Sequence, residues 1–282
     1  MHAGTIVFSH GNSFPAGTYA QLFARWRAAG WRVEAVEKYG HDPRYPVTSN
    51  WPRLRDQLTD FVDGLALGAP VVFVGHSMGG FLSLKAALKR PDLARGVVLL
   101  DAPVLTGWKA HSVQVAKATR LIQRISPGKV AARRRHHWAS VDEARAHFAA
   151  KHIFARWDPQ CLEDYLHAGL ASAPQGGVQL AFDRQVEAHI YNTVAHNLGD
   201  VLRRHPPRCP VAFIGGRQSR EVRQVGLAAT RTLVRERFQW LDGTHLFALE
   251  HPAETAERVL ALLGTMPLQG DRGDAISGTP GC

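Results

Sequence analysis

Short apolar runs alternate along the chain with stretches in which apolar residues recur at steps of three and four. The runs are apolar throughout rather than at every second residue, which predicts strands buried on both faces, as in a parallel sheet. The other spacing, as at Tyr19, Leu22, Phe23 and Trp26, predicts helices with one buried face. The predicted strands are residues 5–8, 31–36, 71–74, 96–100, 211–214 and 238–241, and the predicted helices are residues 17–29, 52–65, 81–89, 221–235 and 252–263.

The alternation stops after Pro103 and resumes only near residue 209. Residues 104–208 show helical patterns with Gly and Pro breaks and no convincing strand run. We therefore expect an α/β core, residues 1–103 and 209–264, whose sheet of about six strands is flanked by helices. Residues 104–208 follow the carboxyl end of a strand, where the ligand sites of such sheets lie, so we expect them to form a helical cap over the site. The alternative is a purely structural extension. The Gly-rich residues 265–282 are predicted to be a flexible tail.

Composition and charge exclude several classes of protein. The 282 residues carry a net charge of +10, and seven of these excess charges lie in residues 102–210. No aromatic-studded motif accompanies them, so a solvated helix face explains them better than nucleic-acid binding. No apolar stretch approaches 18 residues, which argues against a membrane span. The three cysteines have no metal-type spacing, and the N-terminus lacks a signal-peptide core; both features favour a reduced, cytoplasmic protein.

A serine stands where a buried strand turns into a helix. Residues 75–79 read Gly-His-Ser-Met-Gly, after four apolar strand residues and before a helical pattern. Such a tight turn strains the backbone of the serine, and the flanking glycines avoid the clashes that side chains would cause. Ser77 would then lie at a helix N-terminus, where free N–H groups favour developing negative charge. The alternative is a plain connection between strand and helix.

A serine hydroxyl needs a base, and the base needs a carboxylate. Of the 15 histidines, His245 is the candidate base. It follows the last predicted strand, in a loop that we expect to reach the edge of the sheet near Ser77. His10 and His76 flank other strand ends and are expected either to be structural or to support the catalytic residues from behind. Asp101 and Glu221 both satisfy the chain order of serine, acid and histidine. Asp101 directly ends a strand, and its alternative role is to bind backbone groups there.

With these elements the chain resembles the α/β-hydrolase superfamily over residues 5–263. The resemblance rests on His10-Gly11, on the serine turn at 75–79 and on Gly243-Thr244-His245. In most members the acid stands at the position that corresponds to Ser219 of this chain. In a minority it stands at the position that corresponds to Asp101. The resemblance therefore favours Asp101, with Glu221 as the alternative. Most members also have two further antiparallel strands before the first strand of this chain, so we expect a sheet trimmed to six.

The resemblance also implies an oxyanion hole and a reaction. The backbone N–H groups of Asn12 and Met78 would bind the oxyanion, while Ser77 would form an acyl-enzyme from a carboxylic ester of a small or medium acyl group. The implied substrate is a small, apolar ester, and neither a metal nor an organic cofactor is needed. The alternatives are the same triad acting on a carbon–carbon bond, a lactone or a thioester, an acyltransferase, and a binding protein that kept the fold without the chemistry.

Overall fold

The computed structural model describes residues 3–106 and 127–266. The predicted tail from residue 267 onward lies outside the described residues, as does part of the predicted cap, residues 107–126. Within the described ranges, no helix combines the length and the apolar character needed to cross a membrane.

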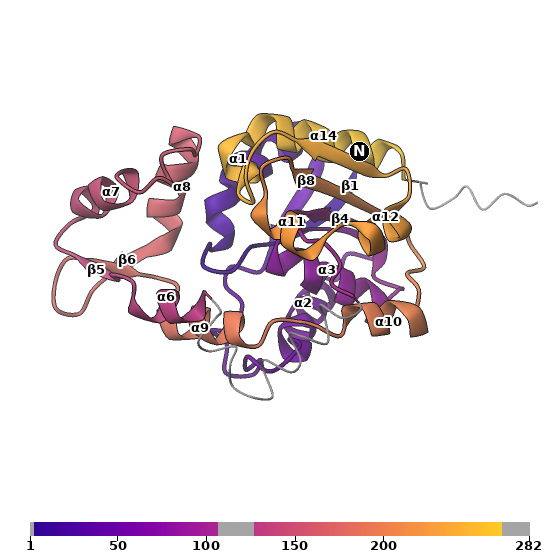
Figure 1. The fold of residues 1–282 in the computed structure, drawn as a ribbon, viewed down its shortest axis with the longest axis horizontal. Helices are drawn as coiled ribbons and strands as arrows, with labels where there is room; N and C mark the ends of the chain where they lie inside the picture. Colours follow the sequence, from indigo (N-terminus) through magenta and orange to yellow (C-terminus); the bar gives the residue numbers. More distant parts are fainter. Residues whose placement is uncertain (1–2, 107–126, 267–282) are drawn as a thin grey trace, which may run out of the picture.

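A six-stranded sheet forms the centre of the molecule, as the sequence predicts (Figure 1). All neighbouring strands are parallel, in the order β2-β1-β3-β4-β8-β9. Because every strand runs the same way, the loops that follow the strands gather at one edge of the sheet. The strands are β1 (Gly4–Ser9), β2 (Trp31–Ala35), β3 (Val71–His76), β4 (Ala94–Leu100), β8 (Val211–Gly216) and β9 (Phe238–Leu241).

Helices cover both faces of the sheet, and each face has its own apolar core. Successive strand residues point to opposite faces, so Ile6 and Phe8 lie in one core and Val7 lies in the other. The first core holds α1 (Ala20–Ala28) and α14 (Pro252–Gly264) against the sheet. The second holds α2 (Pro52–Gly64), α3 (Met78–Lys89) and α12 (Ala228–Val234).

One predicted helix is wrong in its extent. Residues 221–235 form two helices, α11 (Arg220–Val225) and α12, rather than one. Gly226 separates them with φ +82°, a backbone conformation that ends a helix and that glycine adopts readily. The break leaves α11 as a short, separate turn of helix just after Ser219.

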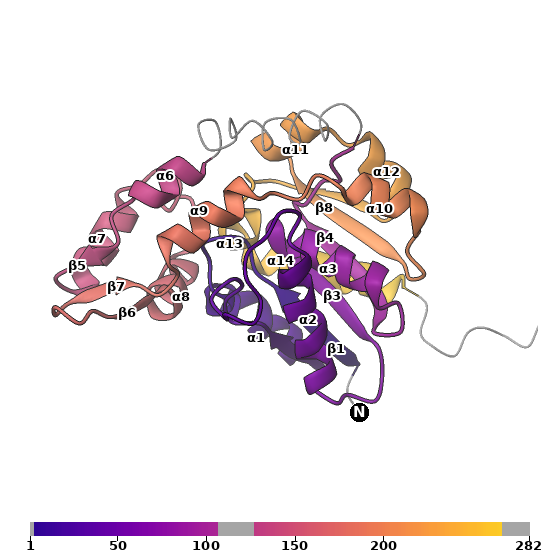
Figure 2. The same ribbon diagram turned by 90° about the horizontal axis from the view of Figure 1, so that it is seen from below.

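The segment between β4 and β8 is called the inserted segment below (residues 104–208). Its described part extends mostly to one side of the core (Figures 1 and 2). It contains helices, as predicted, but also a small antiparallel sheet in the order β5-β7-β6 that the sequence did not predict. These strands have only two or three residues each, too few for a readable alternation of polar and apolar positions. Its described elements are α6 (Gly128–Arg133), β5 (His137–Trp138), α7 (Val141–Ala149), α8 (Pro159–Gly169), β6 (Leu170–Ser172), β7 (Val178–Leu180), α9 (Arg184–Asn192) and α10 (Leu198–Arg204).

Trp26 anchors α1 to α14 and provides a test of the first core. Its side chain is fully buried, and its indole N–H donates to the Ala256 carbonyl at 3.3 Å. Trp26→Ala should lower the free energy of unfolding in urea by about 3–5 kcal/mol, because it leaves a cavity and removes the hydrogen bond to Ala256. Ala24→Ser, at an exposed position of the same helix, is the control. Equal stability of the two variants would contradict this packing.

Candidate active site

Ser77 lies in the turn between β3 and α3 with a strained backbone. Its φ of +53° and ψ of −118° place it in a region that residues with side chains rarely adopt. Two glycines permit this turn. A Cβ on Gly79 would overlap the carbonyl oxygen of Ser9, and one on Gly75 would overlap the backbone of Gly79. The start of α3 therefore packs directly on the end of β1, which fixes the direction of the Ser77 side chain.

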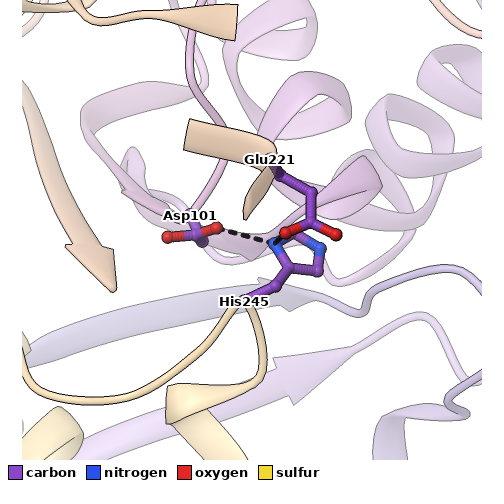
Figure 3. Close-up of side chains that lie close together, drawn as sticks. All are labelled: Asp101, Glu221 and His245. Atoms are coloured by element: carbon purple, nitrogen blue, oxygen red, sulfur yellow. Dashed lines mark hydrogen bonds and ion pairs between the residues drawn. The ribbon is translucent and has the colours of Figure 1, made fainter. Parts of the chain in front are cut away.

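His245 lies between the serine and a carboxylate. Its Nε2 is 2.9 Å from the Ser77 hydroxyl oxygen. Its Nδ1 is 2.7 Å from Oδ2 of Asp101, and Figure 3 shows these two side chains facing each other. A carboxylate can only accept, so Nδ1 carries the proton and Nε2 is free to accept the proton of the serine hydroxyl. The structure thus brings together all three side chains that the sequence predicts for the triad.

Asp101 is held in place by several donors at the end of β4. Its carboxylate is buried, and its Oδ1 accepts the Gly216 N–H at 2.7 Å. Its Oδ2 accepts the Ser219 hydroxyl at 2.5 Å in addition to His245. Buried carboxylates need such partners, because desolvation of an unpaired charge is costly. Ser219, at the position where most superfamily members are expected to carry the acid, here donates a hydrogen bond to the acid instead.

Glu221, the alternative acid, lies near His245 without bonding to it. Its Oε2 is 3.9 Å from His245 Nδ1, beyond hydrogen-bond distance, and its side chain is half exposed. Together with Asp101 and His245 it forms the one cluster of metal-type ligands in residues 3–106 and 127–266 (Figure 3). A metal ion would need the lone pairs of His245 Nδ1 and of the Asp101 carboxylate. Nδ1 carries a proton, and the carboxylate already accepts three hydrogen bonds, so these residues do not fit a metal site.

The environment of His245 favours its protonated form. Burial by itself lowers the pKa, but the hydrogen bond to Asp101 and the negative charges of Asp101 and Glu221 outweigh burial, so the pKa is raised. The imidazolium formed when His245 takes a proton is therefore stabilised inside the site.

His76 and His10, expected to be structural or supporting, are buried and neutral. Burial lowers the pKa of His76 to about 3 and that of His10 to about 4. His76 Nε2 donates to the His245 carbonyl at 2.7 Å, while its Nδ1 accepts the Tyr19 hydroxyl at 2.8 Å. Tyr19 in turn accepts the Gly11 N–H at 3.2 Å. His76 thus links the loop that carries His245 to the loop after β1.

The two predicted oxyanion donors belong to residues near the serine: Asn12 lines the same cavity as Ser77, and Met78 follows Ser77 in the chain. Asn12 follows β1 in the loop of residues 11–14, and Met78 is the first residue of α3. Both residues are buried, and within the described part of the chain neither backbone N–H donates a hydrogen bond. The N–H of Met78 belongs to the first turn of a helix, where such groups lack intrahelical partners. These N–H groups are thus available to an external acceptor.

A cavity of about 570 Å³ opens beside Ser77 and His245. It lies between the core and the inserted segment, and both contribute to its walls. One part of the lining is apolar and another is polar and charged. The apolar and aromatic residues are Phe14, Pro127, Ile153, Tyr191 and Leu246, and the polar ones are Asn12, His152, Arg156, Gln218, Arg220, Glu221, Gln224 and Thr244.

Glu250 supports the loop that carries His245, and the sequence reasoning missed it. Its side chain is buried and accepts the Thr244 N–H at 2.9 Å and the Thr244 hydroxyl at 2.5 Å. Arg156 of the inserted segment donates to Glu250 at 3.2 Å and to Gln218 at 2.8 Å. The sequence signal was an acidic residue directly after the apolar run 246–249. Arg156 gave no comparable signal, because its partners come from distant parts of the chain.

Comparison with known proteins shows the family to which the chain belongs. The sequence model of the Alpha/beta hydrolase family matches residues 6–258, nearly the whole described chain. The chain belongs to the alpha/beta hydrolase family. It is 29% identical to a monoglyceride lipase of Mus musculus over 43% of this chain and 42% of the lipase. It is 32% identical to a probable esterase of Oryza sativa over 42% of this chain and 46% of the esterase. The chain thus matches less than half the length of these curated relatives.

Solved structures extend the likeness of this alpha/beta hydrolase over its whole fold. E-2-(acetamidomethylene)succinate hydrolase has a TM-score of 0.74 and 20% identity, covering 93% of this chain and 91% of that one. A thioesterase domain from the curacin biosynthetic pathway has a TM-score of 0.70 and 19% identity, with 91% of each chain covered. At these identities the likeness establishes the fold.

The two carboxylates near His245 should contribute separately to its pKa. Asp101→Asn should lower that pKa strongly, because it removes both the charge and the bond from Nδ1–H to a carboxylate. Glu221→Gln should lower it less, because only a charge at 3.9 Å is removed. An NMR titration of the imidazole signals measures both, and Glu254→Gln on α14 is the control. A His245 pKa unchanged in Asp101→Asn would contradict the contact.

Proposed function

We propose that this alpha/beta hydrolase cleaves carboxylic esters of small or medium acyl groups through an acyl-enzyme on Ser77. One observation carries the proposal: a continuous chain of hydrogen bonds from Ser77 through His245 to buried Asp101, at the wall of a cavity. The curated relatives named as lipase and esterase support the same reaction class. The apolar part of the cavity lining suits an acyl chain.

The first half of the reaction forms the acyl-enzyme. His245 accepts the Ser77 proton at Nε2 while the serine oxygen bonds to the ester carbonyl carbon. The carbonyl oxygen becomes an oxyanion, which the N–H groups of Asn12 and Met78 bind. Asp101 stabilises the imidazolium and keeps its orientation. His245 then returns the proton to the leaving alcohol as the carbon–oxygen bond of the ester breaks.

The second half repeats these steps with water. His245 removes a proton from a water molecule, whose oxygen attacks the acyl carbon, and Asn12 and Met78 bind the oxyanion again. The acid product leaves as Ser77 regains its proton from His245. Asp101, rather than Glu221, is the acid in this scheme, because it contacts Nδ1 at 2.7 Å and is buried with fixed donors. The inserted segment acts as a cap over the cavity.

Ser77→Ala should abolish ester hydrolysis, because no other group at this position supplies the nucleophile. Turnover of p-nitrophenyl esters from acetate to octanoate measures the loss and the preferred acyl length together. Ser172→Ala, at an exposed position of β6, is the matched control. A Ser77→Ala variant that hydrolyses these esters at the wild-type rate would refute the proposal.

Two isosteric variants identify the acid. Asp101→Asn should lower kcat by about 10⁴-fold, since an amide at this position favours the wrong histidine tautomer. Glu221→Gln should retain most of kcat and shift the rising limb of the kcat/KM profile to lower pH. The sign follows because loss of a nearby negative charge lowers the pKa of His245, which acts as a base only when neutral. A larger loss in Glu221→Gln would assign the acid to Glu221.

A further inference from the structure

The inserted segment forms hydrogen bonds with the loop of residues 11–14, which carries one of the proposed oxyanion donors. The Ser13 hydroxyl donates to Glu187 Oε1 at 2.5 Å. The Asn12 side-chain amide donates to the Glu187 backbone carbonyl at 3.1 Å. Glu187 lies on α9, more than 170 residues further along the chain. Two consecutive loop residues are thus attached to a single residue of the inserted segment.

Glu187 is itself held in one orientation. The residue is only 4% exposed, and its second carboxylate oxygen, Oε2, pairs with Arg134 at 2.7 Å. The two oxygens of the carboxylate therefore have different partners, a hydroxyl on one side and a guanidinium on the other. Rotation of this buried carboxylate would break its bond to Ser13 or separate it from the guanidinium charge, so the carboxylate is a well-placed attachment point.

The loop needs such an attachment because its backbone is strained. Ser13 has φ +81°, a conformation that is unfavourable for a residue with a side chain and that persists only where the surroundings impose it. The side chain of this strained residue makes the hydrogen bond to Glu187. The Asn12 N–H precedes it by one residue, so relaxation of Ser13 would change the path of the loop that carries this N–H.

We propose that Glu187 is a positioning residue that holds the 11–14 loop, so that the oxyanion hole forms only when the inserted segment is seated on the core. This inference rests on the proposed function, since it takes the Asn12 N–H as an oxyanion donor. The inserted segment then completes the active site in addition to covering it. Glu187 touches no reacting atom and acts through the backbone of Asn12 and Ser13.

Ser13→Ala tests the attachment without disturbing the ion pair between Arg134 and Glu187. We expect kcat to fall about tenfold to hundredfold with KM little changed, because a displaced donor weakens transition-state binding more than substrate binding. The inhibition constant of a trifluoromethyl ketone, whose adduct with the serine carries an oxyanion, should rise by a similar factor. Gln21→Ala is the matched control, since it removes another contact between the core and the inserted segment, the 2.9 Å bond from Gln21 to Asp164.

Asn12→Ala and a double variant complete the test. Asn12→Ala keeps the backbone N–H but loses the side-chain bond to Glu187, so kcat should fall in the same direction even if Ser13→Ala folds poorly. Ser13→Ala combined with Glu187→Ala should cost little more than the worse of the two single variants, because both remove the same hydrogen bond between Ser13 and the Glu187 carboxylate. Variants with the kcat and inhibition constant of Gln21→Ala, and only a lower melting temperature, would overturn the inference. Failure of the proposed function would give a different result, namely ester hydrolysis by Ser77→Ala at the wild-type rate.

Discussion

The close packing of α3 against the end of β1 is the constraint on which the site depends. Because only glycine fits at residues 75 and 79, the helix begins directly against the backbone of Ser9. That contact forces Ser77 into its positive φ and directs its hydroxyl toward His245. The same contact places the free N–H of Met78 beside the serine. Strain at one residue is offset by the packing of two buried elements, as is common at catalytic positions.

The rest of the site is supported by buried polar groups that bond to one another. Asp101 accepts from Gly216, Ser219 and His245, and His76 connects the loop of His245 to the loop after β1. Each of these contacts joins residues far apart in the chain at the carboxyl edge of the parallel sheet. In a setting of low dielectric constant such bonds are strong, and a missing partner would be costly. The site is therefore pre-organised before a substrate enters.

The elements that the sequence predicted best are those with a strong local signal. The six buried strands and the serine turn combine apolar runs with glycine at fixed positions, and the structure has them at nearly the same bounds. The bend at Gly226 and the short strands of the inserted segment were missed, because a single glycine and two- or three-residue strands give little periodicity. The acid remained open between Asp101 and Glu221, since chain order alone admits both. The support from Glu187 and Glu250 depends on partners brought together only by folding.

The most direct test of this account is the site of covalent modification by a fluorophosphonate, located by peptide mass mapping. The account predicts one adduct, on the peptide that contains Ser77, with a labelling rate that rises with pH as His245 becomes neutral. An adduct on any other serine, or none on the folded protein, would contradict the claim that Ser77 is an activated nucleophile.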